Sequence, residues 1–162
     1  MAQDSFTLTM FYKSWKEYQE RLARALAPLS HEQLTLRARP GLRSVGENAE
    51  HIIGCRIGWF TYVLHEDPGE VGTTRWDEPD APTRSASELV RGLELTWQMM
   101  AERLERWSDA DMEQPFTDDW DGEEVQLSRA WIIWHVLEHD LHHGGEISLT
   151  LGMHQLQAGF TS

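Results

Sequence analysis

The stretch from Trp131 to Met153, WIIWHVLEHDLHHGGEISLTLGM, is the segment around which the rest of the chain can be interpreted. It is mostly apolar, yet it holds four of the eight histidines of the chain, at His135, His139, His142 and His143. Residues four apart on an α-helix lie one turn above each other on the same face. If this stretch is a helix, two successive pairs of histidines can each direct two imidazoles at one metal ion.

Apolar residues recur at steps of three and four in three earlier stretches, as expected for helices that bury one face. Together with the histidine-rich stretch they predict helices over residues 7–26, 44–64, 85–107 and 128–153. Ser44 and Ser85 each precede a glutamate by three residues, which is the pattern of a capping box at a helix start. Ser128 caps the last helix. Between the third and fourth helices, Asp121-Gly122 indicates a tight turn and a short hairpin.

Four amphipathic helices with long connections predict an all-α fold, a four-helix bundle. The length of 162 residues predicts one domain, residues 1–162, large enough to bury its own core. Gly54 and Gly58 weaken the second helix by about 1 kcal/mol each relative to alanine. We therefore expect a neighbouring helix or a ligand to approach closely at these two positions.

The balance of 27 acidic and 14 basic residues gives a formal charge of −13 without a basic stripe. Such a charge repels nucleic acid and anionic membranes, so we expect neither as a partner. The single Cys55 fits a reducing compartment, and the amino terminus lacks the features of a signal peptide. These observations predict a cytoplasmic protein that binds a small-molecule substrate. The eight tryptophans favour a homodimer that buries an apolar face.

Two well-known metal-site patterns are missing from the sequence. His31-Glu32 and His65-Glu66 lack the second histidine of a metalloprotease motif. No glutamate precedes a histidine by three residues, as a di-iron bundle requires. With these two patterns excluded, the sequence predicts a site that holds a single metal ion.

On a helical wheel, His139 and His143 lie on the apolar side of the last helix, whereas His135 and His142 lie further from that side. His51 is the histidine that a different predicted helix supplies. His51, His139 and His143 are therefore the predicted metal ligands, and three ligands leave a position open for water or substrate. The alternative is a metal-free cluster hydrogen-bonded to neighbouring carboxylates. Such carboxylates can also orient ligating rings, and the candidates are Glu50, Asp140 and Glu146; Glu138 is a further partner for the metal-free cluster.

The run HxxxHxxHHGGE, which follows an earlier helical histidine in the context AEHI, resembles the DinB/YfiT-like superfamily. The resemblance covers most of the chain. It implies an up-down-down-up bundle that holds a divalent metal, zinc or nickel, with three histidines. Position by position, it assigns the ligand on the second helix to His51 and the pair on the last helix to His139 and His143.

Some relatives are transferases or isomerases that use a low-molecular-weight thiol as cosubstrate. The resemblance therefore implies a metal-dependent enzyme, with thiol transfer as the first expected reaction and hydrolysis as the second. The alternative is a non-enzymatic protein that binds a metal for stability or captures a small ligand. Many members read Arg-Gly-Gln after the last ligand, whereas this chain reads Gly144-Gly145-Glu146. The usual arginine is absent, and with it a fixed cation at that position.

Overall fold

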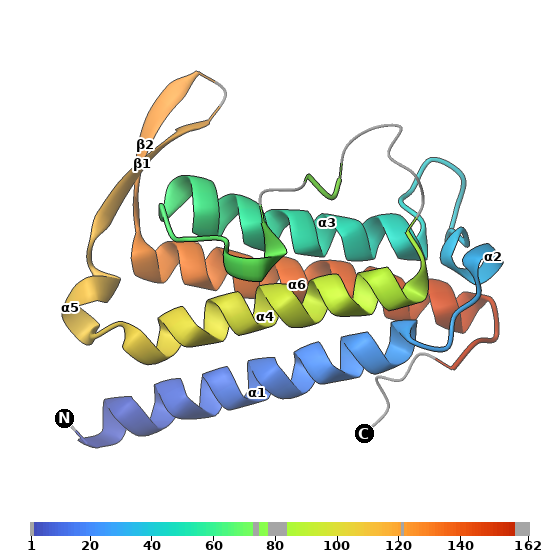
Figure 1. Ribbon diagram of the computed structural model, residues 1–162, viewed down its shortest axis with the longest axis horizontal. Coiled ribbons are helices and arrows are strands. Elements are labelled where there is room, and N and C mark those ends of the chain that lie inside the picture. Colours follow the sequence, from blue (N-terminus) through green and yellow to red (C-terminus); the bar gives the residue numbers. More distant parts are fainter. Residues whose placement is uncertain (1, 73–74, 78–83, 121, 158–162) are drawn as a thin grey trace.

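Four long helices lie side by side in the computed structural model, which describes residues 2–72, 75–77, 84–120 and 122–157 (Figure 1). They are α1 (Ala2–Leu26), α3 (Val45–Ile57), α4 (Ala86–Arg106) and α6 (Arg129–Met153). α1 and α6 run in one direction and α3 and α4 in the other. α3 packs against both α4 and α6, and α1 packs against α4. The prediction of an all-α, up-down-down-up four-helix bundle is confirmed.

Shorter elements close the two ends of the bundle. Beside the start of α3 lies α2 (His31–Leu34), and α3 continues beyond its end as a π-helical segment, Gly58–Val63. A 3₁₀ turn, Gly69–Val71, packs against α4. At the other end, α5 (Asp109–Met112) leads into an antiparallel hairpin of β1 (Pro115–Trp120) and β2 (Glu123–Ser128). The hairpin was predicted from Asp121-Gly122; Asp121 lies outside the described residues, and Gly122 has the left-handed φ of +84°.

The starts of three long helices agree with the predicted caps. Ser44 and Ser85 each accept from the amide three residues on, while Glu47 and Glu88 reach back to the two serine amides. Ser128 accepts from the amide of Trp131 at 3.2 Å. These bonds satisfy amide donors that have no partner within the helix, so the local sequence specifies where the helices begin.

Apolar side chains from all four helices meet in one core. Its central members are almost without exposed surface, among them Leu22, Ile52, Leu93 and Ile147. Burial of such side chains stabilises the fold by about 1.5–3 kcal/mol each. The core therefore packs α3 against α6.

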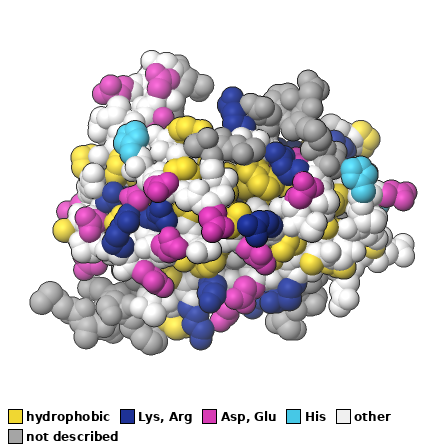
Figure 2. All heavy atoms as spheres, in the orientation of Figure 1, with side chains coloured by type: hydrophobic (Ala, Val, Ile, Leu, Met, Phe, Trp, Pro, Cys, Tyr) yellow, Lys and Arg dark blue, Asp and Glu magenta, His cyan; other side chains and the backbone are white. Residues whose placement is uncertain are grey.

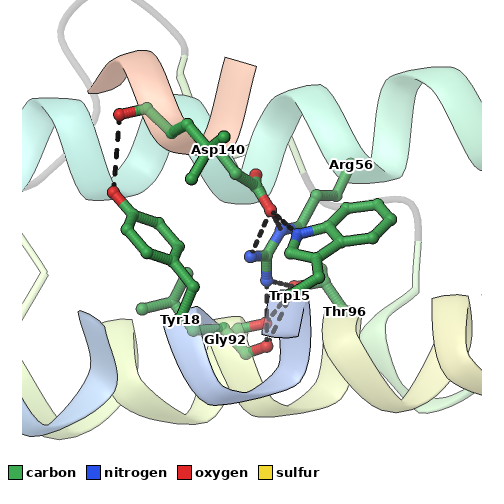
Figure 3. A network of polar contacts seen from close by, with 8 residues as sticks. Trp15, Tyr18, Arg56, Gly92, Thr96 and Asp140 are labelled. Carbon is green, nitrogen blue, oxygen red and sulfur yellow. Dashed lines mark hydrogen bonds and ion pairs between the residues drawn. The ribbon is translucent and has the colours of Figure 1, made fainter. Parts of the chain in front are cut away.

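A buried polar network crosses this core (Figure 3). Arg56 on α3 forms an ion pair with Asp140 on α6, and it also donates to Thr96 on α4. The indole of Trp15 on α1 donates to the same aspartate at 2.7 Å. Side chains from all four long helices thus join one network, and its carboxylate comes one residue after His139.

Acidic and basic side chains are interspersed over the face shown in Figure 2. None of the helices in the described part of the chain has the length and apolarity that a membrane crossing requires.

Candidate metal centre

Three histidines from two helices come together where α3 and α6 pack against each other. His51 comes from the second turn of α3, and His139 and His143 come from successive turns of α6. One ring nitrogen from each lies within 4.8 Å of the other two. The Nε2 atoms of His51 and His139 are 3.1 Å apart. Nitrogens that share one zinc ion at about 2.1 Å in tetrahedral geometry lie roughly 3.4 Å from one another, which is close to this separation.

Carboxylates contact the outer edges of two of these rings. Nδ1 of His51 lies 3.3 Å from Oδ2 of Asp77, and Nδ1 of His143 lies 2.8 Å from Oε2 of Glu146. An ionised carboxylate only accepts hydrogen bonds, so each Nδ1 carries the proton and each Nε2 keeps its lone pair. Carboxylates in this position are a common feature of histidine-ligated metals, because they fix the tautomer and the ring orientation.

The third ring, His139, cannot satisfy both of its nitrogens within the described protein. Its Nδ1 is buried and has no hydrogen-bond partner among the described residues. Its Nε2 faces the Nε2 of His51, which already presents a lone pair. A proton on Nε2 lets it donate to the lone pair of His51 and leaves the buried Nδ1 without a partner, whereas a proton on Nδ1 leaves two Nε2 lone pairs facing each other. In the second case a cation among the three rings would accept the lone pairs, so the donor set fits a metal ion.

The electrostatics of the candidate metal centre keep the three rings neutral. Burial, together with the smaller influence of the neighbouring His143 and His51, lowers the pKa of His139 to about 3. Burial also lowers the pKa values of His51 and His143, against the opposing influence of the carboxylates beside them. Neutral imidazole is the form that binds metal, so the site is prepared for a cation at neutral pH.

Asp77 is a contact that the sequence did not reveal. It comes from the loop after the π-helical segment, 26 residues beyond His51. Gly54 explains how the loop comes so close: a Cβ there would lie 3.0 Å from Oδ1 of Asp77. A close approach does occur at Gly54, but a loop side chain makes it in place of the expected helix or ligand. At Gly58 no described atom outside the helix's own backbone lies within 4 Å of an added Cβ, so no neighbouring helix makes the expected approach there.

The other two histidines of α6 lie outside the group of three. His135 stacks on Trp131 with ring centroids 5.1 Å apart, and Trp59 meets its edge at 4.9 Å. These rings form an aromatic wall beside His139, whose centroid is 6.1 Å from that of His135. His142 is exposed, and its Nε2 lies 3.6 Å from Oε1 of Glu146.

Of the carboxylates expected to orient the ligands, Glu146 alone contacts one of the three rings. Asp140 pairs with Arg56 in the core, and Glu50 pairs with Arg84 at 3.2 Å. Glu138 lies 4.0 Å from His135, outside the candidate centre.

The first residue of the Gly144-Gly145-Glu146 departure is sterically constrained. A Cβ at Gly144 would lie 2.9 Å from Cζ of Tyr18 and closer still to its hydroxyl, because this tyrosine of α1 packs over α6. An arginine at this position would collide with that ring. A cation is nevertheless close to the site: the charge of Arg43, from the loop before α3, lowers the pKa of all three histidines.

Comparison with known proteins agrees with this architecture. The family model of the DinB superfamily matches residues 14–147, a range that contains all three histidines. Among solved structures, a DinB-like protein from Bacillus cereus ATCC 10987 has a TM-score of 0.73 and 22% sequence identity. The match covers 94% of this chain and 95% of that chain. At this identity the likeness shows the fold alone. No curated protein matches the chain.

Proposed function

The chain belongs to the DinB superfamily, and from that premise we propose that it is a metal-dependent enzyme with a mononuclear divalent-metal site formed by His51, His139 and His143. The observation that carries the proposal is the convergence of three neutral ring nitrogens at one place, two of them only 3.1 Å apart. Zinc or nickel is the metal we expect, because imidazole nitrogens suit both ions.

The reaction class follows from the number of ligands. Three protein ligands leave an open position, the arrangement typical of catalytic sites. A divalent ion held there would lower the pKa of a thiol or a water molecule toward neutrality. We propose transfer to or from a low-molecular-weight thiol as the first reaction class and hydrolysis as the second.

The protein side chains have separate tasks in this proposal. Asp77 and Glu146 hold His51 and His143 with their Nε2 lone pairs directed toward the candidate metal centre. The aromatic wall of Trp59, Trp131 and His135 keeps one flank of the site apolar. An apolar flank excludes water and strengthens electrostatic interactions with a bound substrate.

Metal content measured on purified protein tests the site. After reconstitution with zinc and removal of free metal, we expect one ion per chain in the unaltered protein. His139→Ala removes a ligand and should abolish stoichiometric binding. His142→Ala is the matched control, because it removes a neighbouring exposed histidine that lies outside the group of three. Full zinc occupancy in His139→Ala would rule out the proposed ligand set.

Cobalt substitution tests whether the open position exists. A cobalt-loaded protein with a free position should gain a sulfur-to-metal charge-transfer band when 2-mercaptoethanol is added. A spectrum unchanged by the thiol, together with a large loss of thermal stability on chelation, would favour the alternative of a non-enzymatic protein with a structural metal.

The proposed quaternary structure is a homodimer through the apolar surface of α1 and α6. Phe11 and Trp134 are 57% and 59% exposed there. They border a cavity of about 620 Å³ together with Ile133 and Leu137. Identical patches can face each other across a two-fold axis, which makes a second copy the simplest occupant. Sedimentation should show a dimer that Trp134→Lys converts to a monomer, whereas Met153→Lys, at a 58% exposed position outside this cavity, should not.

A further inference from the structure

The contact between Asp77 and His51 is too weak to hold the loop from which Asp77 comes. Nδ1 of His51 and Oδ2 of Asp77 are 3.3 Å apart, and the Asp77 side chain is 46% exposed. An exposed pair of this kind contributes little to stability, whereas each ordered loop residue loses backbone entropy. Other contacts must therefore fix residues 75–77 beside α3.

Arg84 supplies such contacts. Its Nη1 donates to the carbonyl oxygen of Trp76 at 2.9 Å, and its Nη2 donates to the carbonyl oxygen of Arg75 at 3.3 Å. The guanidinium also lies over the Trp76 ring, 4.3 Å from its centroid. A planar guanidinium can donate in several directions at once while it stacks on an aromatic face. One side chain thus contacts both of the residues that immediately precede Asp77.

The same guanidinium is attached to α3 next to His51. Nη1 of Arg84 pairs with Oε1 of Glu50 at 3.2 Å, and the Arg84 amide donates to the same oxygen at 3.3 Å. The Arg84 and Glu50 side chains are only 17% and 11% exposed, so this pair is largely shielded from solvent. Glu50 immediately precedes His51 in the chain. Arg84 therefore connects the helical turn that carries this histidine to the loop that carries its carboxylate partner.

The ring of Trp76 gives the loop a second attachment, on α4. An added Cβ at Gly92 of α4 would lie 2.5 Å from Cη2 of Trp76, so the ring occupies the space that a side chain would need. At Gly54 of α3 an added Cβ would lie 3.0 Å from Oδ1 of Asp77. The two glycines leave room for the loop, and its position is specified by contacts with both helices.

We propose that Arg84 is a positioning residue for the candidate metal centre: it holds residues 75–77 against α3 and so keeps Asp77 on Nδ1 of His51. Asp77 then fixes the proton on Nδ1 and leaves the Nε2 lone pair of His51 for a metal ion. Arg84 acts on His51 through Asp77. The inference rests on the proposed function only for its effect on metal binding, because the position of the His51 proton is a property of the metal-free protein.

NMR of metal-free, full-length protein with ¹⁵N-labelled histidine rings measures which nitrogen of His51 carries the proton. At neutral pH the unaltered protein should show the proton on Nδ1 alone, and His51→Gln identifies the signals of this ring. Arg84→Met should release Asp77 and give His51 a mixture of the two neutral tautomers. Retention of the unaltered pattern in Arg84→Met, or a proton on Nε2 of His51 in the unaltered protein, would overturn the proposal.

Arg103→Met is the matched control. Arg103 is 8% exposed, and its Nη2 donates to the carbonyl oxygen of Asp67 at 2.7 Å, so its removal costs similar contacts to a different loop. It should leave the His51 tautomer unchanged. Equal changes in the two variants would show that Arg84 acts through general stability and would overturn its positioning role. Should Arg84→Met fail to fold, Arg84→Lys takes its place: it keeps a charge beside Glu50, but one ammonium group cannot reproduce the guanidinium fork.

Zinc affinity gives the second readout. Arg84→Met and Asp77→Ala should each lower it about 10–100-fold, as expected when a ligating imidazole loses the group that orients it. The double variant should bind zinc no more weakly than Asp77→Ala, because Arg84 acts through Asp77, and additive losses would overturn the proposal. Absence of zinc uptake in the unaltered protein would contradict the metal site instead, and the tautomer measurement would still decide the role of Arg84.

Discussion

Arg56 on α3 and Asp140 on α6 form an ion pair in which neither side chain has exposed surface, with Nη2 2.7 Å from Oδ2. Asp140 immediately follows the candidate ligand His139, and Arg56 lies five residues after His51. Figure 3 shows the guanidinium also directed at Thr96 of α4 and the indole of Trp15 directed at the same carboxylate. The pair therefore joins the two helices that carry the three histidines and sets how they lie against each other.

Removing one partner of this pair should destabilise the protein strongly. Asp140→Asn leaves the buried charge of Arg56 without its counter-ion, which typically costs about 3–5 kcal/mol. Urea unfolding measures the change, and the double variant Arg56→Met, Asp140→Leu should recover most of it, because it buries no charge. The exposed pair Lys13–Glu17 is the control: Glu17→Gln should cost less than about 1 kcal/mol. Equal effects of Asp140→Asn and Glu17→Gln would contradict this account.

Replacement of two adjacent glycines of α6 by alanine should change the stability of the protein in opposite directions. Gly144→Ala forces its methyl group against the ring of Tyr18 and should destabilise the protein by about 1–3 kcal/mol. Gly145→Ala meets no atom within 4 Å and removes a flexible residue from a helix interior. It should therefore stabilise the protein by up to about 1 kcal/mol. Thermal unfolding of the two variants checks the difference in sign, and a shift of the same sign in both would refute the steric role of Tyr18.

The carboxylate on His143 should set the strength of metal binding. Glu146→Gln weakens the hold on the Nδ1–H of His143, and loss of such a partner typically lowers metal affinity about 10–100-fold. Competition with a coloured zinc chelator measures the affinity. Glu138→Gln is the matched control, since Glu138 also lies three residues from a histidine, His135, but outside the candidate centre. Comparable losses in the two variants would count against a special role for Glu146.

His139 should make the stability of the metal-free protein depend on pH. Burial lowers its pKa to about 3, compared with an ordinary value of 6.5 in the unfolded chain. Between these values the unfolded chain binds a proton that the folded chain does not, so the free energy of unfolding falls as the pH drops through this window. His139→Leu removes this contribution. Its urea midpoint should decline less between about pH 7 and about pH 5 than that of the unaltered protein, and parallel declines would contradict the assignment.

Cys55 should be unreactive in the folded protein. Burial raises the pKa of its thiol, and the nearby Asp140 carboxylate raises it further. The thiolate is the reactive form, so alkylation by iodoacetamide at mildly alkaline pH should be slow in the native state and rapid in urea. Mass spectrometry follows both reactions. Rapid labelling of the native protein would show that the thiol is more accessible than its position beside the buried ion pair indicates.

Local sequence patterns predicted much of this structure. The capping serines Ser44, Ser85 and Ser128 start three helices where the sequence placed them, because a cap acts within a few residues of the helix end. His139 and His143, which the helical wheel placed on the apolar side, do come together with His51, whereas His142 lies beside His143 and Glu146. Periodicity reports which side of a helix faces the core, and this is a property of the helix alone.

These local patterns could not predict which side chains contact each other when their residues lie far apart in the sequence. Glu50 and Asp140 lie near the ligands along the chain, yet they pair with Arg84 and Arg56. Asp77 and Arg43 come from loops, where no periodicity indicates the direction of a side chain.

By itself, the sequence determined four helices, the starts of three of them and the three histidines that come together, because helix caps and apolar spacing act over a few residues. Only the tertiary structure decided which carboxylates hold the imidazoles, why Gly144 has no side chain, and where a cation lies near the site. Those contacts depend on how α1, α3, α6 and the loops pack against one another, since each joins residues far apart in the chain and closes only when the helices are in place.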